Sequence, residues 1–191
     1  FSCDSVTIVQ LFLLHLILNL ASMEPNNSIL SAAAAQQKMH RMALELAENI
    51  APATKSLILI GIRNNGVVIA HKIAALIAPY VQCTITILEA SLDKDTPSEI
   101  TYSAPAQYTG AHIVLVDDVS NSGKTLLYAI KPLLDFYPVS IQTLVLVERM
   151  YRLYPVKPDY VGLSISTSLQ DHIRVLVTGT EIDGVCVETK A

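Results

Sequence analysis

Residues 113–125 run Ile113-Val114-Leu115-Val116-Asp117-Asp118-Val119-Ser120-Asn121-Ser122-Gly123-Lys124-Thr125. The four leading apolar residues predict a central parallel strand that is covered on both faces. Two carboxylates follow where this strand is expected to end, at the sheet edge where α/β proteins bind ligands. Small polar residues then lead into an apolar helical pattern over 126–136. The unpaired N–H groups and partial positive charge at the start of such a helix favour a phosphate group.

This segment resembles the phosphoribosyl-pyrophosphate-binding motif of the type I phosphoribosyltransferases. The resemblance implies that Asp117 and Asp118 orient the ribose, stabilise positive charge in the transition state and bind Mg²⁺, directly or through water. It also implies that the ribose 5-phosphate is held by the loop residues Ser120, Asn121, Ser122, Gly123, Lys124 and Thr125. A nucleotide-triphosphate P-loop is a poorer match, because it requires glycine where Asp118 stands. A plain strand-to-helix turn with a solvated acidic pair is the remaining alternative.

The composition is that of a folded globular protein. The chain has 191 residues, of which 51% are hydrophobic and 16% charged, which suits one domain with a substantial core. Its formal net charge of −4 gives no overall attraction to nucleic acid. The three cysteines, Cys3, Cys83 and Cys186, form neither a disulfide framework nor a metal-ligand spacing. We therefore expect a reducing, cytoplasmic compartment.

The first 22 residues differ from the rest. Residues 6–20 are almost wholly apolar, yet this stretch is short for a membrane span, and no basic region precedes it as in a secretory signal. Three interpretations stay open: an extension foreign to the native protein, a signal or anchor fragment, and a helix packed on the domain. We expect an N-terminal extension over 1–22 and a phosphoribosyltransferase domain over 23–191, with no membrane partner for the domain.

Strands and helices alternate through the middle of the chain. Helical patterns cover 31–50, 66–78 and 126–136; apolar strands cover 57–60, 83–88, 113–116 and 141–147, with candidate edge strands at 160–163 and 174–177. This alternation predicts an α/β fold with a mainly parallel central sheet flanked by helices. Residues 90–110 are predicted to form a long loop or irregular hairpin that acts as a lid. Together with the motif, this predicts the type I phosphoribosyltransferase fold with a small hood or lid.

A second loop, Gly61-Ile62-Arg63-Asn64-Asn65-Gly66, follows the strand at 57–60. By resemblance to type I phosphoribosyltransferases, pyrophosphate is expected to bind Arg63, Asn64, Asn65 and Gly66, with Arg63 as a catalytic cation. Backbone donors, a guanidinium and Mg²⁺ together suit a leaving group that carries several negative charges. Taken alone, the loop would be interpreted as an ordinary strand-to-helix turn.

The segment after the strand at 141–147 narrows the family. Residues 146–155 read LVERMYRLYP, 158–162 read PDYVG and 165–168 read ISTS. Their order resembles the pyrimidine-operon attenuator/uracil phosphoribosyltransferase family. The resemblance implies that the base is recognised by Arg149, Tyr160 and Val161. Without it, Arg149 would be interpreted as a surface cation.

Three features depart from that family. Asn65 stands where the family has arginine, and the lid at 91–108 contains Lys94 but no arginine. Asn121 stands where purine enzymes have a catalytic aspartate and uracil-type enzymes an aromatic residue. The first two departures remove cations from the pyrophosphate end, so we expect slow turnover.

The resemblance implies a pyrimidine-salvage enzyme that transfers ribose 5-phosphate from phosphoribosyl pyrophosphate to a nucleobase, with uracil expected, Mg²⁺ as cofactor and pyrophosphate released. A hypoxanthine/guanine-type purine enzyme is one alternative, because such enzymes have a run similar to residues 157–162. A non-catalytic, nucleotide-sensing and RNA-binding regulator of pyrimidine genes is another, although the acidic balance disfavours RNA. A homodimer or higher homo-oligomer is expected.

Exchange of either aspartate for asparagine should weaken binding of phosphoribosyl pyrophosphate and leave thermal stability almost unchanged. Asp117→Asn and Asp118→Asn each remove a charge without creating a cavity. Isothermal titration calorimetry in the presence of Mg²⁺ measures the affinity, and thermal unfolding measures the stability. Normal affinity in both variants would contradict the assignment of this motif.

Overall fold

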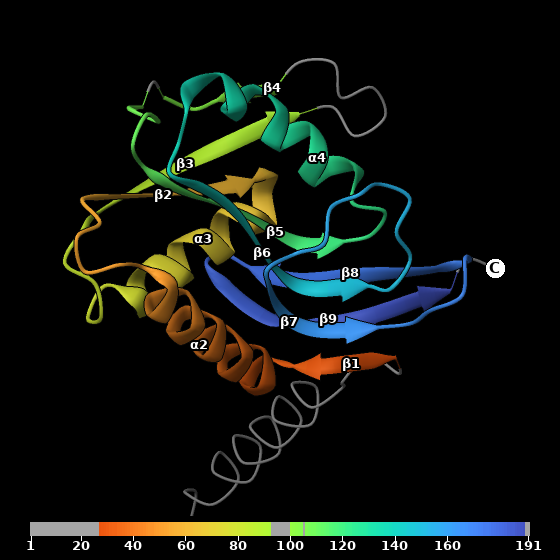
Figure 1. Ribbon diagram of the computed structural model, residues 1–191. Helices are drawn as coiled ribbons and strands as arrows, with labels where there is room; N and C mark the ends of the chain where they lie inside the picture. The colour runs from red at the N-terminus through yellow and green to blue at the C-terminus, as the bar shows by residue number, and fades with distance from the viewer. Residues whose placement is uncertain (1–26, 93–99, 105, 190–191) are drawn as a thin grey trace, which may run out of the picture.

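A computed structural model describes residues 27–92, 100–104 and 106–189 (Figure 1). The elements in chain order are β1 (Ser28–Ser31), α2 (Ala32–Asn49), β2 (Ser56–Ile62), α3 (Arg63–Ile77), β3 (Thr84–Leu92), β4 (Ile100–Tyr102), β5 (His112–Ser120), α4 (Lys124–Ile130), η1 (Lys131–Phe136), β6 (Ser140–Arg149), β7 (Tyr160–Ile165), β8 (Asp171–Thr178) and β9 (Glu181–Thr189). The extension expected over 1–22 lies outside the described residues. None of the helices within these ranges is long and apolar enough to cross a membrane.

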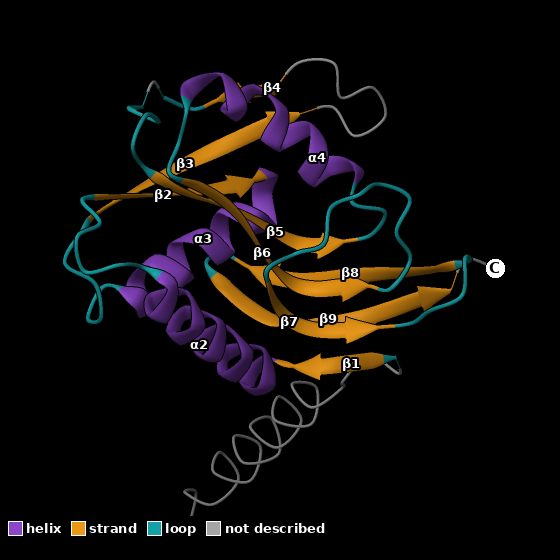
Figure 2. Ribbon diagram, in the orientation of Figure 1, coloured by secondary structure: helices purple, strands orange, loops and turns teal. Residues whose placement is uncertain are grey.

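Two sheets organise the fold (Figure 2). The six-stranded central sheet has the order β4-β3-β2-β5-β6-β7 and is parallel except for β4, which pairs antiparallel to β3. A three-stranded antiparallel sheet, which we call the hood sheet, has the order β1-β9-β8 and joins the two ends of the described chain. The predicted fold, a mainly parallel α/β sheet with a hood, is confirmed.

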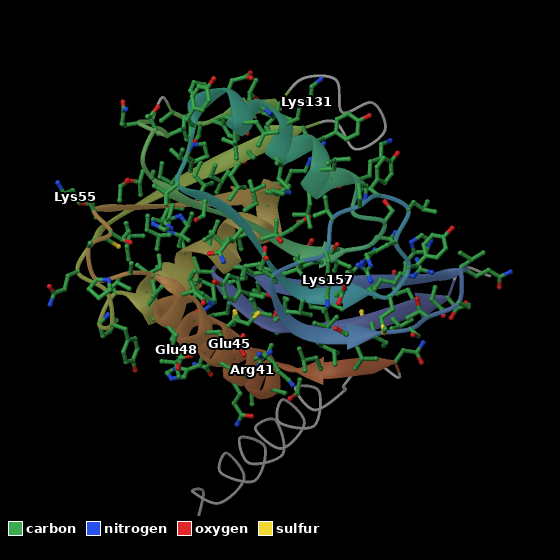
Figure 3. All side chains as sticks on the ribbon, in the orientation of Figure 1. Arg41, Glu45, Glu48, Lys55, Lys131 and Lys157 are labelled. Atoms are coloured by element: carbon green, nitrogen blue, oxygen red, sulfur yellow. The ribbon has the colours of Figure 1, made fainter. Side chains whose placement is uncertain are left out.

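The central strands are buried because each of their faces meets a separate core. Successive side chains of a strand point to opposite faces, so Leu57 and Leu59 of β2 enter the core with α2 and α3, and Ile58 and Ile60 enter the core with α4 and η1. The hood sheet belongs to the first core through Val175, Ile182 and Val185. Figure 3 shows side chains filling the space between these layers.

The strand that carries the acidic pair is longer than predicted. β5 does not end at Val116 but continues to Ser120, because Asp117 and Val119 remain paired with Val145 and Val147 of β6. Asp117 and Asp118 therefore lie within β5, and the loop between β5 and α4 is shorter than predicted. The carboxylates are held by a sheet backbone rather than by a loop.

Two helices also differ from their predicted ranges. Residues 61–66, which were expected to form a loop, belong to β2 and α3 instead: β2 extends to Ile62, and α3 begins at Arg63. The φ of Arg63 is +53°. The helix expected over 126–136 divides into α4 and the 3₁₀ helix η1, with Pro132 near the start of η1. Proline has no N–H to donate to the preceding turn, which explains the change of helix type.

Of the two forms expected for residues 90–110, the described part has the hairpin form, and its role as a lid stays a prediction. β3 runs on to Leu92, and β4 pairs with it antiparallel, with Ala90 opposite Tyr102 and Leu92 opposite Ile100. Residues 93–99, which include Lys94, lie outside the described residues. The hairpin therefore extends the central sheet by one edge strand.

Candidate functional site

A polar pocket of about 420 Å³ opens at the carboxyl ends of β2 and β5. Its lining comes from two stretches that are far apart in the chain, Ile62–Asn65 and Asp117–Leu126. The predicted pyrophosphate and ribose-phosphate segments therefore meet in one cavity. The two strands are neighbours and parallel, so their ends necessarily lie at the same sheet edge.

Hydrogen bonds orient the two carboxylates of β5. Asp117 is 8% exposed, and its Oδ1 accepts the backbone N–H of Asp118 at 2.9 Å. Asp118 is half-buried, and its Oδ1 accepts the backbone N–H of Val119 at 2.8 Å. Asn65 crosses from α3 and donates its Nδ2 hydrogen to Asp118 Oδ2 at 2.8 Å. The second carboxylate is thus bonded through both of its oxygens.

The start of α3 presses against β5, which explains the glycine at position 66. A Cβ atom built on Gly66 would lie 2.6 Å from the carbonyl oxygen of Val116, a contact that backbone atoms cannot relieve easily. Arg63 and Asn64 line the pocket. Gly66 does not line it, but allows the start of α3 to lie close to β5. Arg63 therefore stays available as a cation for an anionic ligand.

The predicted phosphate loop is held in shape by the segment after β6. The backbone N–H groups of Leu153 and Tyr154 donate to the carbonyl oxygen of Ser122 at 3.1 and 3.0 Å. Gly123, which caps α4, has φ +81°, a conformation that other residues adopt only with strain. A Cβ atom built there would lie 3.2 Å from Val156 O and 3.4 Å from Tyr154 O. Glycine is therefore favoured by the backbone conformation, and a larger residue would also press on these two carbonyl oxygens.

A second cavity of about 180 Å³ adjoins the first. It shares Asp118, Val119 and Asn121 with the larger pocket, and the rest of its lining is Arg149, Asp171, His172 and Ile173. The last three belong to β8, so the hood sheet supplies one wall. Hydrogen bonds from the side chain of Ser168, from the side chain of Thr189 and from the backbone of Ser168 hold the pKa of the Asp171 carboxyl below its usual value.

Arg149 is buried at this second cavity, with 6% of its surface exposed. Its Nη1 donates to Asn121 Oδ1 at 3.1 Å, and its Nη2 donates to the carbonyl oxygen of Ser168. Its Nε is buried and has no hydrogen-bond partner among the described residues. The guanidinium carbon also lies 5.7 Å from the centre of the Tyr151 ring, within range of a cation–π contact. A surface cation is therefore the wrong interpretation of Arg149.

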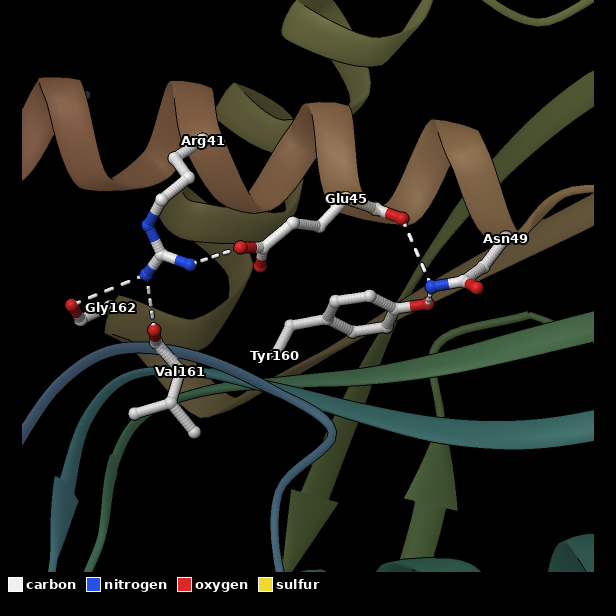
Figure 4. A network of polar contacts seen from close by, with 6 residues as sticks. All are labelled: Arg41, Glu45, Asn49, Tyr160, Val161 and Gly162. Atoms are coloured by element: carbon white, nitrogen blue, oxygen red, sulfur yellow. Dashed lines mark hydrogen bonds and ion pairs between the residues drawn. The ribbon is translucent and has the colours of Figure 1, made fainter.

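The other two residues expected to recognise a base, Tyr160 and Val161, line neither cavity. Tyr160 is buried and points toward α2, where its hydroxyl accepts from Asn49 Nδ2 at 3.1 Å and donates to Gln142 Oε1 at 3.2 Å (Figure 4). Burial raises the pKa of Tyr160. The carbonyl oxygen of Val161 accepts from Arg41 Nη2 at 2.5 Å. Neither residue is among those lining the two cavities, so this part of β7 anchors α2 to the sheet.

The donor chemistry of the larger pocket suits Mg²⁺. Magnesium is commonly bound by one or two carboxylates together with phosphate oxygens of a substrate, and Asp117 and Asp118 supply such carboxylates. In the described ranges, no group of three or more His, Cys, Asp or Glu side chains gathers at one point. The two carboxylates therefore fit a Mg²⁺ ion that is also bound by phosphate oxygens of a substrate.

The residues that the sequence did not predict come from the hood sheet. Asp171, His172 and Ile173 line the smaller cavity, and the carbonyl oxygen of Val175 accepts from Asn65 at 3.3 Å. A backbone carbonyl has no signature in the sequence. The run ISTS at residues 165–168, which is part of the resemblance to the attenuator family, is the nearest signal in the sequence, because Ser168 bonds both Arg149 and Asp171.

Comparison with known proteins shows the family to which the chain belongs. Residues 25–179 match the family model of the phosphoribosyl transferase domain. The chain is 34% identical to the bifunctional protein PyrR of Thermus aquaticus over 166 residues, which is 82% of this chain and 90% of that protein. It is 35% identical to the bifunctional protein PyrR of Chloroflexus aurantiacus, with the same coverage.

Solved structures share the fold. The hypoxanthine phosphoribosyltransferase of Trypanosoma cruzi superimposes with a TM-score of 0.69 at 16% identity, covering 87% of this chain and 98% of that one. A hypoxanthine-guanine phosphoribosyltransferase of Bacillus anthracis gives a TM-score of 0.63 at 18% identity, covering 79% and 87%. At such identities, the likeness concerns the architecture.

Substitution of Gly123 by alanine should weaken nucleoside monophosphate binding about tenfold, equivalent to about 1.4 kcal/mol. The new methyl group would press on the carbonyl oxygens of Tyr154 and Val156 and displace the phosphate loop. Gly179→Ala is the matched control, because Gly179 also has a positive φ, of +60°, but has nothing within 4 Å of its Cβ position. Calorimetry compares the two variants, and equal affinity in both would contradict the proposed phosphate cradle.

Proposed function

The chain belongs to the phosphoribosyl transferase domain family, and on this premise we propose that it transfers ribose 5-phosphate from phosphoribosyl pyrophosphate to a nucleobase, preferably uracil. The observation that carries the proposal is the meeting of Ile62–Asn65 and Asp117–Leu126 in one polar pocket. One stretch offers a guanidinium, the other two carboxylates and a glycine-containing loop. These are the groups that a ribose with an anion at each end requires.

Different parts of the pocket lining are assigned to different parts of phosphoribosyl pyrophosphate. The 5-phosphate is assigned to the loop from Ser120 to Thr125, which includes the cation Lys124. The ribose hydroxyls are assigned to Asp117 and Asp118, and pyrophosphate to Arg63 and the backbone N–H groups that follow it. Because the amide of Asn65 is bonded to Asp118, the contribution of Asn65 to pyrophosphate binding is assigned to its backbone.

The reaction exchanges one bond at C1 of the ribose for another. A ring nitrogen of the base forms the new bond as the bond to the pyrophosphate oxygen breaks. Pyrophosphate leaves with the bonding electrons, and the proton of the ring nitrogen is released to solvent. Positive charge develops on the ribose, and the carboxylates of Asp117 and Asp118 stabilise it electrostatically. When bound, Mg²⁺ would neutralise part of the negative charge on pyrophosphate. The guanidinium of Arg63 stabilises the charge of the same leaving group.

The smaller cavity is assigned to the base. It adjoins the ribose site through Asp118, and its lining includes the polar residues Asn121 and Arg149 and the apolar residue Ile173. The buried Nε of Arg149, which has no partner among the described residues, supports a role in holding a polar ligand. A volume of about 180 Å³ suits a single pyrimidine ring.

Two alternatives are kept for the test. A purine base is disfavoured by Asn121, which provides an amide where purine enzymes have a carboxylate. An RNA-binding regulator is kept as an alternative because of the resemblance to the pyrimidine-operon attenuator family, and relatives are named as bifunctional proteins. Lys55, Lys131 and Lys157, however, lie on well-separated parts of the molecule, and the net charge is −4 (Figure 3). A cytoplasmic location and a homo-oligomeric state complete the proposal.

Incubation with Mg²⁺, phosphoribosyl pyrophosphate and a panel of free bases tests the proposal. Uracil should give uridine monophosphate and pyrophosphate faster than hypoxanthine or guanine gives its nucleotide. Faster turnover with a purine would overturn the base assignment. Salt-dependent RNA binding without formation of any nucleotide would favour the regulator instead.

Within the same assay, Arg149→Met should raise the KM for uracil by about tenfold to hundredfold, the range expected for a lost charged hydrogen bond. Arg152→Met is the matched control, because Arg152 lies on the same segment but is exposed and lines neither cavity. It should behave as the wild type. An unchanged KM in Arg149→Met would remove Arg149 from the base site.

A further inference from the structure

Asn65 joins three parts of the molecule through one side-chain nitrogen. It lies near the start of α3, and its Nδ2 donates to Asp118 Oδ2 at 2.8 Å and to the carbonyl oxygen of Val175 at 3.3 Å. Both partners are acceptors only, so the reversed amide would place its oxygen against a carboxylate and a carbonyl. The orientation with nitrogen toward both is therefore the only one that avoids repulsion.

We propose that Asn65 is a positioning residue, which fixes the carboxylate of Asp118 and connects it to the hood sheet. The proposal rests on the function proposed above. Asp118 Oδ1 is held by the N–H of Val119 at 2.8 Å, so the bond from Asn65 to Oδ2 removes the remaining freedom of rotation. A carboxylate that is oriented before the substrate binds does not lose that freedom during the reaction.

The chemical type of the donor matters as much as its position. An amide orients Asp118 without neutralising it, whereas a guanidinium at the same place would form a charge-assisted pair with the carboxylate. The full negative charge of Asp118 therefore stays directed at the ribose, where positive charge develops. Asparagine in place of the family's arginine thus gives the side chain at this position the task of orienting an acid, while its backbone stays assigned to pyrophosphate.

The bond to Val175 extends the effect to the base cavity. Val175 is buried on β8, the same strand that presents His172 and Ile173 to the smaller cavity. Asn65 therefore sets the position of this wall relative to Asp118, which both cavities share. A substitution of Asn65 should therefore affect both the ribose site at Asp118 and the smaller cavity assigned to the base.

Asn65→Asp is the sharpest substitution, because it keeps the size of the side chain and replaces the donor by an acceptor that faces two acceptors. Affinity for phosphoribosyl pyrophosphate with Mg²⁺, measured by calorimetry, should fall by about tenfold or more. Asn49→Asp is the matched control. Asn49 also bridges two elements, donating to Glu45 O at 3.0 Å and Tyr160 Oη at 3.1 Å, but lines neither cavity, so its variant should bind normally.

A double-mutant cycle separates positioning from a general structural role. Asn65→Ala and Asp118→Ala should each weaken binding of phosphoribosyl pyrophosphate, and the double variant should lose less than the product of the two factors. Independent effects in this cycle would overturn the proposal, as would normal affinity in Asn65→Asp. If thermal unfolding shows that Asn65→Asp is not folded, the cycle of Asn65→Ala and Asp118→Ala tests the positioning role instead.

The two proposals fail in different ways. Wild-type protein that binds phosphoribosyl pyrophosphate but makes no nucleotide from any base would overturn the proposed function alone. The binding cycle would still confirm or reject the role of Asn65, because it needs no turnover. For a catalytically active wild type, a fall in kcat for Asn65→Ala at saturating substrate would further support positioning over simple loss of binding.

Discussion

Burial of β5 on both faces is the constraint on which the rest of the site depends. Ile113 and Leu115 enter one core and Val114 and Val116 the other, so the strand can neither rotate nor slide without exposing apolar surface. The two carboxylates at its end inherit this rigidity. A strand that is buried on both faces therefore fixes the positions of the two carboxylates at the pocket.

The neighbouring elements approach β5 closely because glycine permits it. Gly66 lets α3 lie against the carbonyl of Val116, and this contact brings Asn65 within hydrogen-bonding distance of Asp118. On the other side, Gly123 turns the phosphate loop under the carbonyls of Tyr154 and Val156. Close backbone packing at these two glycines therefore positions the two segments that line the pocket.

The hood sheet turns a phosphate-binding edge into a site with two compartments. β8 supplies a wall of the smaller cavity, and the segment before it bonds Arg149 through Ser168. Arg149 in turn bonds Asn121, the residue that replaces the carboxylate or aromatic group of other family members. The substitution at one position is therefore accommodated by a buried cation from another strand, and the two residues form one unit at the proposed base site.

The sequence by itself determined the alternation of apolar strands and helices, the α/β class and the two motif segments, because each depends on residues adjacent in the chain. It also identified Asp117, Asp118, Arg63 and the loop after β5 as neighbours, since parallel strands end at one edge. Only the tertiary structure decided where β5 ends, because its pairing with β6 continues past the apolar run. Only it decided that Tyr160 faces α2 and that Arg149 is buried, because these follow from which neighbour covers each side of a strand. The strands β1 and β9 were missed for the same reason: Ser28 pairs with Cys186, and contacts between such distant residues leave no periodic pattern in the sequence near either one.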